Sequence, residues 1–411
     1  MIKEKQNSIY PWVVVGLLWM VAFLNYMDRQ MLSTMRVPMM GDIAELETAA
    51  NFGRLMAVFL WIYGLMSPLS GIIADRMSRK WLIVGSLGVW SAVTFLMGFA
   101  TTFDQLYILR GLMGVSEALY LPAGLAMIAD FHRDRSRSLA VGIHMTGLYA
   151  GQAVGGFGAA IAAMLSWHHT FQLFGIIGIV YACILAFALK DVPRDTSPKA
   201  SEKFKLPVGK SLAMLLTNIS FWIILFYFCI PSIPGWAAKN WLPTLFSESL
   251  GVDMSVAGPI ATISIAASSL VGVLLGGRLS DWWVMRNVRG RVFTGAIGLV
   301  LIIPALMFIG YGGSLIPAVA GAALFGIGFG MFDANNMPIL CQFVPSRQRA
   351  TAYGIMNMCG VFAGAVITAT LGRSSDAGHL GRDFALMAVV VLVMVVVQVA
   401  FLRPKTIDMK D

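Results

Sequence analysis

Five ionisable side chains lie inside apolar stretches of this sequence, and their types suit the binding of an anion and of a proton. They are Asp28, Arg29, Arg110, Glu117 and Asp333. A charge near the centre of a bilayer costs about 2.5–3.5 kcal/mol on insertion scales, so such residues usually face a bundle interior or a water-filled path and mark a functional site. Alternatively, Asp28 and Arg29 reach the membrane surface from a helix end, or form a fixed ion pair that locks two helices together.

The spacing of these residues predicts which of them share a helix face. Arg110 and Glu117 are seven residues apart, which is two helical turns, so they lie on one face about 10 Å apart along the axis. Tyr26 and Arg29 share a face at i, i+3, whereas Asp28 points to a flank. We expect Arg110 in the outer half of its helix and Glu117 near mid-depth.

The two arginines are the predicted receptors for a carboxylate substrate. A guanidinium holds a carboxylate through two parallel hydrogen bonds and stays charged in a membrane. The carboxylate of the substrate and that of Glu117 then compete for the same arginine. When a substrate binds this arginine, Glu117 is expected to bind a proton. Asp28 is expected to be a second proton site or a gate. The alternatives are a fixed structural network around Arg29 and Arg110, and coupling to Na+.

Composition indicates that these residues are positioned by a polytopic helical membrane protein. The chain has 411 residues, of which 58% are hydrophobic and 12% are charged, whereas about 25% of a soluble domain is charged. A spanning helix needs about 20 apolar residues. The chain divides at polar breaks into twelve such runs: 11–35, 54–74, 81–100, 105–129, 138–163, 169–189, 217–242, 255–277, 292–310, 315–341, 349–372 and 383–403.

The distribution of Lys and Arg predicts the orientation of the chain. With the N-terminus in the cytoplasm, the loops on the other side hold only a few basic residues: Arg36, Arg54, Lys239, Arg373 and Arg382. Lys239 and Trp241 would then lie near the membrane surface at the end of the seventh run. Both termini are therefore expected in the cytoplasm. The net charge of +9 is explained by these loops and indicates no nucleic-acid partner.

Two halves of the chain repeat each other. Gly71-Ile72-Ile73-Ala74-Asp75-Arg76-Met77-Ser78-Arg79-Lys80 is echoed by Gly277-Arg278-Leu279-Ser280-Asp281 and the later Arg286. We expect a six-helix bundle at 1–189, a basic cytoplasmic linker at 190–216 and a second six-helix bundle at 217–411. The charges of the repeated motif are predicted to latch the bundles on the cytoplasmic side, or merely to set the topology; they are Asp75, Arg76, Arg79, Asp281 and Arg286.

These motifs make the chain resemble the major facilitator superfamily over essentially its whole length. The loop pattern GxxxDRxxRK, its weaker second copy and the two sets of six helices carry the resemblance. The finer match is to the anion:cation symporter family of sugar-acid carriers, which is related to sialin. It rests on Tyr26-Met27-Asp28-Arg29, on Arg110 followed by Glu117-Ala118 and Pro122, and on Trp61-Ile62-Tyr63. The first of these motifs and the segment 110–120 also resemble spinster-like lipid carriers.

Several polar residues are candidates for contacts with hydroxyl or carbonyl groups of a substrate: Tyr26, Tyr63, Gln152, Asn335, Asn336 and Asn357. The resemblance implies that Asn357 lies where sugar-acid carriers have a binding asparagine. Leu148 stands where the galactonate carrier has a substrate glutamine, which is a departure from the family pattern. For each of these polar residues, a hydrogen bond between helices is the alternative role.

The sequence thus predicts an all-α membrane protein of the major facilitator fold that transports and is not an enzyme. We expect proton-coupled symport of a small organic anion, such as a hexuronate, an aldonate or sialic acid, across a bacterial inner membrane, by a monomer embedded in the lipid bilayer. No metal-ligand cluster, nucleophile–base pair or cofactor motif is present in the sequence, so no metal and no cofactor are predicted. A spinster-like lysolipid transporter is the alternative function.

Overall fold

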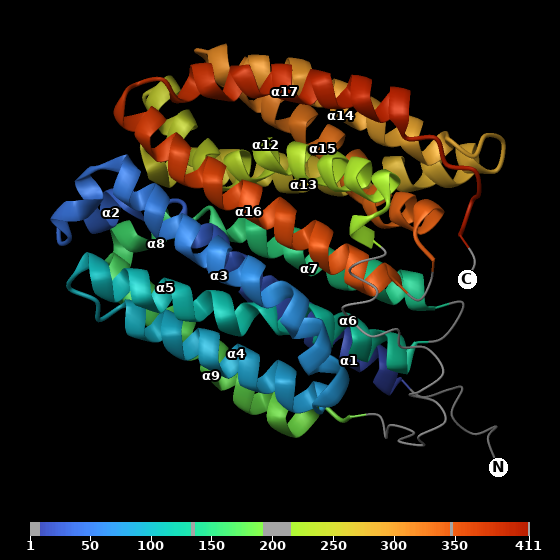
Figure 1. Ribbon diagram of the computed structural model, residues 1–411. Helices are drawn as coiled ribbons and strands as arrows, with labels where there is room; N and C mark the ends of the chain where they lie inside the picture. Colours follow the sequence, from blue (N-terminus) through green and yellow to red (C-terminus); the bar gives the residue numbers. More distant parts are fainter. Residues whose placement is uncertain (1–8, 133–135, 192–214, 346–347, 410–411) are drawn as a thin grey trace.

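The computed structural model describes residues 9–132, 136–191, 215–345 and 348–409. They form helices joined by short turns (Figure 1). The helices of the N-terminal half are α1 Tyr10–Leu32, α2 Arg36–Met40, the 3-10 helix η1 Ala44–Glu47, α3 Ala49–Arg76, α4 Arg79–Met97, α5 Phe103–Ala118, α6 Tyr120–Phe131, α7 Arg137–Gly155, α8 Gly158–Leu165 and α9 Trp167–Ala188. Those of the C-terminal half are α12 Ile219–Leu250, α13 Met254–Val284, α14 Gly290–Tyr311, α15 Leu315–Phe343, α16 Arg349–Asp376 and α17 Leu380–Phe401.

The helix content confirms the predicted all-α membrane fold. In the described part of the chain, 11 helices are long and apolar enough to cross a bilayer, with α5 and α6 forming a single span. α7 and α8 form a further span that bends by 49° between Gly155 and Gly158, which brings the number to 12. A helix satisfies its own backbone hydrogen bonds, and this is why lipid-crossing segments adopt it.

The helices gather in two halves that meet along α3 and α16 and along α7 and α13. In Figure 1 the blue and green helices of the N-terminal half lie below the yellow and red ones of the C-terminal half. The linker predicted at 190–216 lies almost wholly outside the described residues, between the end of α9 and the start of α12. The boundaries of the two halves therefore stay a prediction.

The seventh helix differs from its predicted extent in a way that matters for the site. α12 continues to Leu250 rather than ending at 242, with Pro231, Pro234 and Pro243 inside it. Lys239 is therefore inside a helix and not in a loop, and Trp241 is fully buried against Phe52 of α3. The helix therefore extends about two turns beyond its predicted end, and Trp241 packs on the N-terminal half near the start of α3. That both residues lie near the membrane surface stays a prediction.

The spacing between the halves changes along α3. We call the end that holds Tyr10 and Met409 the terminal face, and the other end the opposite face. A Cβ atom placed on Gly53, near the opposite face, would lie 2.9 Å from the carbonyl oxygen of Thr368, and one on Gly64 would lie 2.6 Å from the Phe362 ring. By contrast, a Cβ atom on Gly71, on the same helix face two turns beyond Gly64, would meet nothing within 4 Å. The halves are thus in close contact near the opposite face. Toward the terminal face the contact between α3 and α16 loosens, from 4.0 Å between a Cβ on Gly354 and Pro68 to no contact at Gly71.

The carboxylate of Asp376 links the two halves at the opposite face. Asp376, at the last turn of α16, accepts hydrogen bonds from the backbone amides of Ala49 (2.7 Å) and Ala50 (2.8 Å), which begin α3. The first amides of a helix have no partner within the helix, and the helix dipole favours a negative charge there. Asp376 therefore joins the two halves by capping a helix of the other half.

Replacing Asp376 by Ala should loosen the opposite face. Hydrogen bonds to a charged group contribute about 1.5–3 kcal/mol, so the population open at this face should rise about tenfold or more. Hydrogen–deuterium exchange of peptides covering 49–60 should accelerate accordingly. The control is Asp383→Ala, since Asp383 lies at the same face but bonds Arg382 of its own helix. Equal exchange in the two variants would contradict a role of Asp376 in closure.

Candidate functional site

The centre of the site is a buried ion pair between the first and fifth helices. Arg29, in the last turn of α1, donates from Nε to Glu117 of α5. The Glu117 side chain is fully buried and that of Arg29 is 13% exposed. The Arg29 partner is thus an acid 88 residues away in sequence, whereas its neighbour Asp28 points elsewhere.

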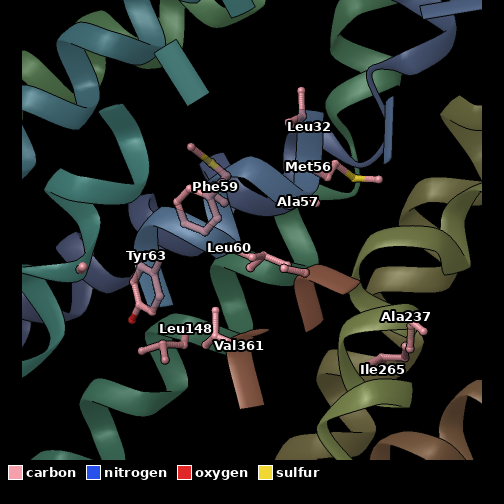
Figure 2. Close-up of a cluster of buried hydrophobic side chains, with 14 of the residues drawn as sticks. Leu32, Met56, Ala57, Phe59, Leu60, Tyr63, Leu148, Ala237, Ile265 and Val361 are labelled. Carbon is pink, nitrogen blue, oxygen red and sulfur yellow. The ribbon is translucent and has the colours of Figure 1, made fainter. Parts of the chain in front are cut away.

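Aromatic rings surround the guanidinium of Arg29. Its central carbon lies 4.6 Å from the ring centre of Tyr63, 4.9 Å from that of Phe59 and 5.1 Å from that of Tyr26. The faces of aromatic rings attract cations, so this cage stabilises the charge even when Glu117 is not its partner. Figure 2 shows Phe59 and Tyr63 one turn apart on α3, with their rings stacked at 5.7 Å.

Arg110 lies next to this pair without an acid in direct contact. It is 4% exposed, its guanidinium carbon lies 4.6 Å from the Phe59 ring centre, and one terminal nitrogen lies 2.8 Å from the sulfur of Met113. A buried charge needs hydrogen-bonding partners, and the buried Nε of Arg110 has none among the described residues.

Asp28 occupies the flank that its position on the helix predicts. It is 5% exposed, and one carboxylate oxygen lies 3.5 Å from the hydroxyl of Thr94 on α4. The other oxygen is buried without a partner. Asp28 and Arg110 nevertheless interact electrostatically, so the two acids and two arginines form one cluster within the N-terminal half.

The other predicted contact residues take different positions. Asn357 donates to the hydroxyl of Ser67 at 2.8 Å, so it bridges α16 and α3. Asn335 is fully buried and donates to the carbonyl of Met331 on its own helix, and Asn336 donates to Asp333 at 3.1 Å. Gln152 is buried in α7. Leu148 is buried in α7, and Figure 2 shows it among the hydrophobic side chains of the core.

Two residues near the site were not identified as site residues from the sequence. Phe59 looks like an ordinary core residue of an apolar helix, and no pattern marks it as the ring shared by Arg29 and Arg110. Lys239 carried a signal, since it is a charge beside Ala237 and Ala238, but the polar residues that follow it suggested a helix end. Its side chain reaches Phe329 of α15, inside the bundle.

The predicted cytoplasmic latch is only partly visible. Arg79 at the start of α4 pairs with Asp130 of α6, within the N-terminal half. Asp281 is exposed, and Arg286 stacks at 4.0 Å on the ring of Trp282 in its own half. The side chains of Asp75 and Arg76 lie outside the described residues, so the latch stays a prediction. Among the side chains that are described, no ion pair joins the halves at the terminal face.

Comparison with known proteins identifies the fold. The model of the Major Facilitator Superfamily matches residues 18–368. The chain belongs to this superfamily. It is therefore a membrane transporter and not an enzyme, as the repeated loop motif and the two sets of six helices indicated. No group of three or more His, Cys, Asp or Glu that could hold a metal ion occurs among the residues described.

Curated relatives support the finer resemblance to anion carriers. A probable sulfoacetate transporter of Cupriavidus necator is 26% identical over 90% of this chain and 88% of its own length. A probable galactarate/D-glucarate transporter of Escherichia coli is 23% identical over 90% of both chains. The protein spinster of Drosophila melanogaster is 28% identical over 72% of this chain and 50% of its own length.

A solved structure shows the same fold. The crystal structure of a bacterial homologue of the human lysosomal transporter spinster, in an inward-facing and occupied conformation, has a TM-score of 0.80 to this chain. It is 19% identical and covers 96% of this chain and 97% of its own. At this identity the likeness establishes the architecture alone.

The shared ring of Phe59 provides a test of the cluster. Each cation–π contact contributes about 0.5–2 kcal/mol, so Phe59→Leu should lower the free energy of unfolding by about 1–4 kcal/mol and weaken anion binding. The measurement is thermal unfolding in detergent with and without a bound anion. Phe171→Leu makes the same truncation at a buried ring without a guanidinium neighbour. If both variants lost equal stability and kept equal anion-dependent shifts, Phe59 would be ordinary core packing.

Proposed function

We propose that the protein is a secondary active transporter that moves a small organic anion together with protons by alternating access. The observation that carries this proposal is the buried Arg29–Glu117 pair with the unpaired Nε donor of Arg110 beside it. A carboxylate of the substrate would bind Arg29 and Arg110, and Glu117 would carry the coupled proton. Asp28 would be a second proton site or a gate.

The coupling follows from the competition for Arg29. A substrate carboxylate that takes the hydrogen bond of Arg29 leaves Glu117 without its cation. Glu117 is fully buried, and an isolated buried carboxylate is strongly unfavourable unless it is neutralised. Binding of the anion therefore favours binding of a proton, and the two leave together when the site opens to the other side.

The looser contact between the halves toward the terminal face corresponds to one conformation of the transport cycle. If this face is cytoplasmic, as the basic loops predict, the arrangement is the inward-open one of a carrier with both termini in the cytoplasm. The return to the outward-open form would break the contacts of the opposite face. These contacts include the two hydrogen bonds that Asp376 accepts from the first amides of α3. The bond from Gln30 to the carbonyl of Lys239 also joins the halves.

The named relatives support a small organic anion as the substrate. They include carriers named for sulfoacetate, galactarate, D-glucarate and D-galactonate, several of them bacterial. We propose a sugar acid or a similar anion as the substrate, and a monomer in a bacterial inner membrane as the transporting unit. The spinster relative favours a second candidate, transport of a lysolipid by the same fold. A thermal shift of the purified protein with a sugar acid and not with lysolipid would decide between the two.

Glu117→Gln should separate coupling from binding. Glutamine cannot exchange a proton, so accumulation driven by a pH gradient in proteoliposomes should be abolished, while counterflow exchange of substrate continues. The matched control is Asp104→Asn, an exposed acid in the first turn of the same helix. Loss of uptake and counterflow together would show that Glu117 is structural.

Arg110→Ala and Arg29→Ala test the carboxylate receptors. Truncating one partner of a buried charge interaction costs about 2–5 kcal/mol, so the apparent affinity for the anion should fall at least tenfold. Uptake over a range of substrate concentrations measures this, with Arg54→Ala, an exposed arginine of α3, as the control. Unchanged affinity in both variants would overturn the receptor assignment.

A further inference from the structure

Lys239 brings a second cation to the site from the C-terminal half. Its backbone carbonyl accepts a hydrogen bond from the side chain of Gln30 at 2.8 Å. Gln30 follows Arg29 directly in α1, so Lys239 of α12 lies at the level of the Arg29–Glu117 pair, across the boundary between the halves. Arg29 and Lys239 also interact electrostatically.

The ammonium group of Lys239 points into the C-terminal half. It lies 5.0 Å from the ring centre of Trp236 and 5.8 Å from that of Phe329 on α15. No carboxylate lies within ion-pair distance of it among the described residues. The aromatic rings thus stabilise the charge of Lys239, as other rings do for Arg29. The hydrogen-bond donors of the Lys239 ammonium group stay available to an anion.

Asp333 shows that this region opens into the space between the halves. It lies one turn after Phe329 on α15, and its side chain is exposed although the residue is well inside a spanning helix. It interacts electrostatically with Lys239 and with Tyr26, Tyr149 and Tyr353. Those tyrosines come from α1, α7 and α16, which belong to both halves.

We infer that Lys239 is a second anion receptor and that the preferred substrate is a dianion, with one acidic group on Arg29 and Arg110 and the other on Lys239. This inference rests on the proposed function and specifies its substrate class. A monoanion neutralises the cations of one half only, whereas a dianion binds cations on both. Asp333, which accepts from Asn336, is the acid that interacts electrostatically with Lys239 without a direct ion pair between them.

A dianion held in this way would also connect substrate binding to the movement of the halves. Its two acidic groups bind side chains of α1 and α12, which belong to different halves. Closing the space between the halves brings both cations onto the ligand, and opening it separates them. A monoanion on Arg29 lacks the second attachment, so it should bind more weakly and be carried more slowly.

The test compares acids that differ in one charge. The probes are three pairs of dianion and monoanion: galactarate with galactonate, glucarate with gluconate, and sulfoacetate with 2-hydroxyethanesulfonate. Binding is measured by thermal shift of the purified full-length protein, and transport by uptake into proteoliposomes. The unaltered protein should bind at least one dianion about tenfold more tightly than its monoanion partner.

Lys239→Gln should remove this preference. The affinity for the dianion should fall about tenfold or more, while that for the monoanion changes by less than threefold. Lys239→Arg keeps the charge and should keep the preference, and Lys80→Gln, at the start of α4 on the terminal face, should leave both affinities unchanged. Retention of the dianion preference in Lys239→Gln, in a protein that still melts cooperatively, would overturn the inference.

The outcomes separate this inference from the proposed function. Uptake of the monoanions with no dianion preference in the unaltered protein would overturn the role of Lys239 and leave anion transport intact. If none of the six acids binds or is carried, the dianion inference fails together with the sugar-acid proposal. A dianion preference that depends on Lys239 supports both.

Discussion

The ion pair between Arg29 and Glu117 is the interaction on which the site depends. It places a charge of each sign in the apolar interior, and removing one partner leaves the other uncompensated at a cost of about 3–5 kcal/mol. A buried ion pair contributes little net stability compared with apolar packing. In a carrier, the Arg29–Glu117 pair is useful because a ligand can replace one of the two partners. The ring of Phe59 stabilises both Arg29 and Arg110.

The charges of the site are distributed over both halves, whereas the contacts that close the opposite face are mostly neutral. Small residues there let the backbones approach closely, as at Gly53 against Thr368. Such contacts form and break at little electrostatic cost, so the conformation can respond to the charge of the ligand. In the proposed mechanism the cations on α1 and α12 would provide that response, because a bound anion would bring them together.

Most of the helices could be predicted from hydropathy, because each crossing segment has to be apolar and to satisfy its own backbone. The predicted end of the seventh helix was wrong, because this part of the helix is surrounded by other helices and not by lipid. The seventh helix was predicted to end at 242, although α12 continues to Leu250 and packs on the N-terminal half near its end, with Trp241 against Phe52. Hydropathy does not distinguish a charge that faces water outside the membrane from one that faces a space inside the bundle.

The sequence by itself determined which ionisable groups lie in the spans and which of them share a helix face, since both follow from residue type and from the helical repeat. It did not determine their partners. Glu117 shares a face with Arg110, yet it pairs with Arg29 of another helix, and Lys239 joins the site from the other half. Only the tertiary structure decided these pairings, because the distance between two side chains on different helices depends on how the helices pack and not on the spacing within either one.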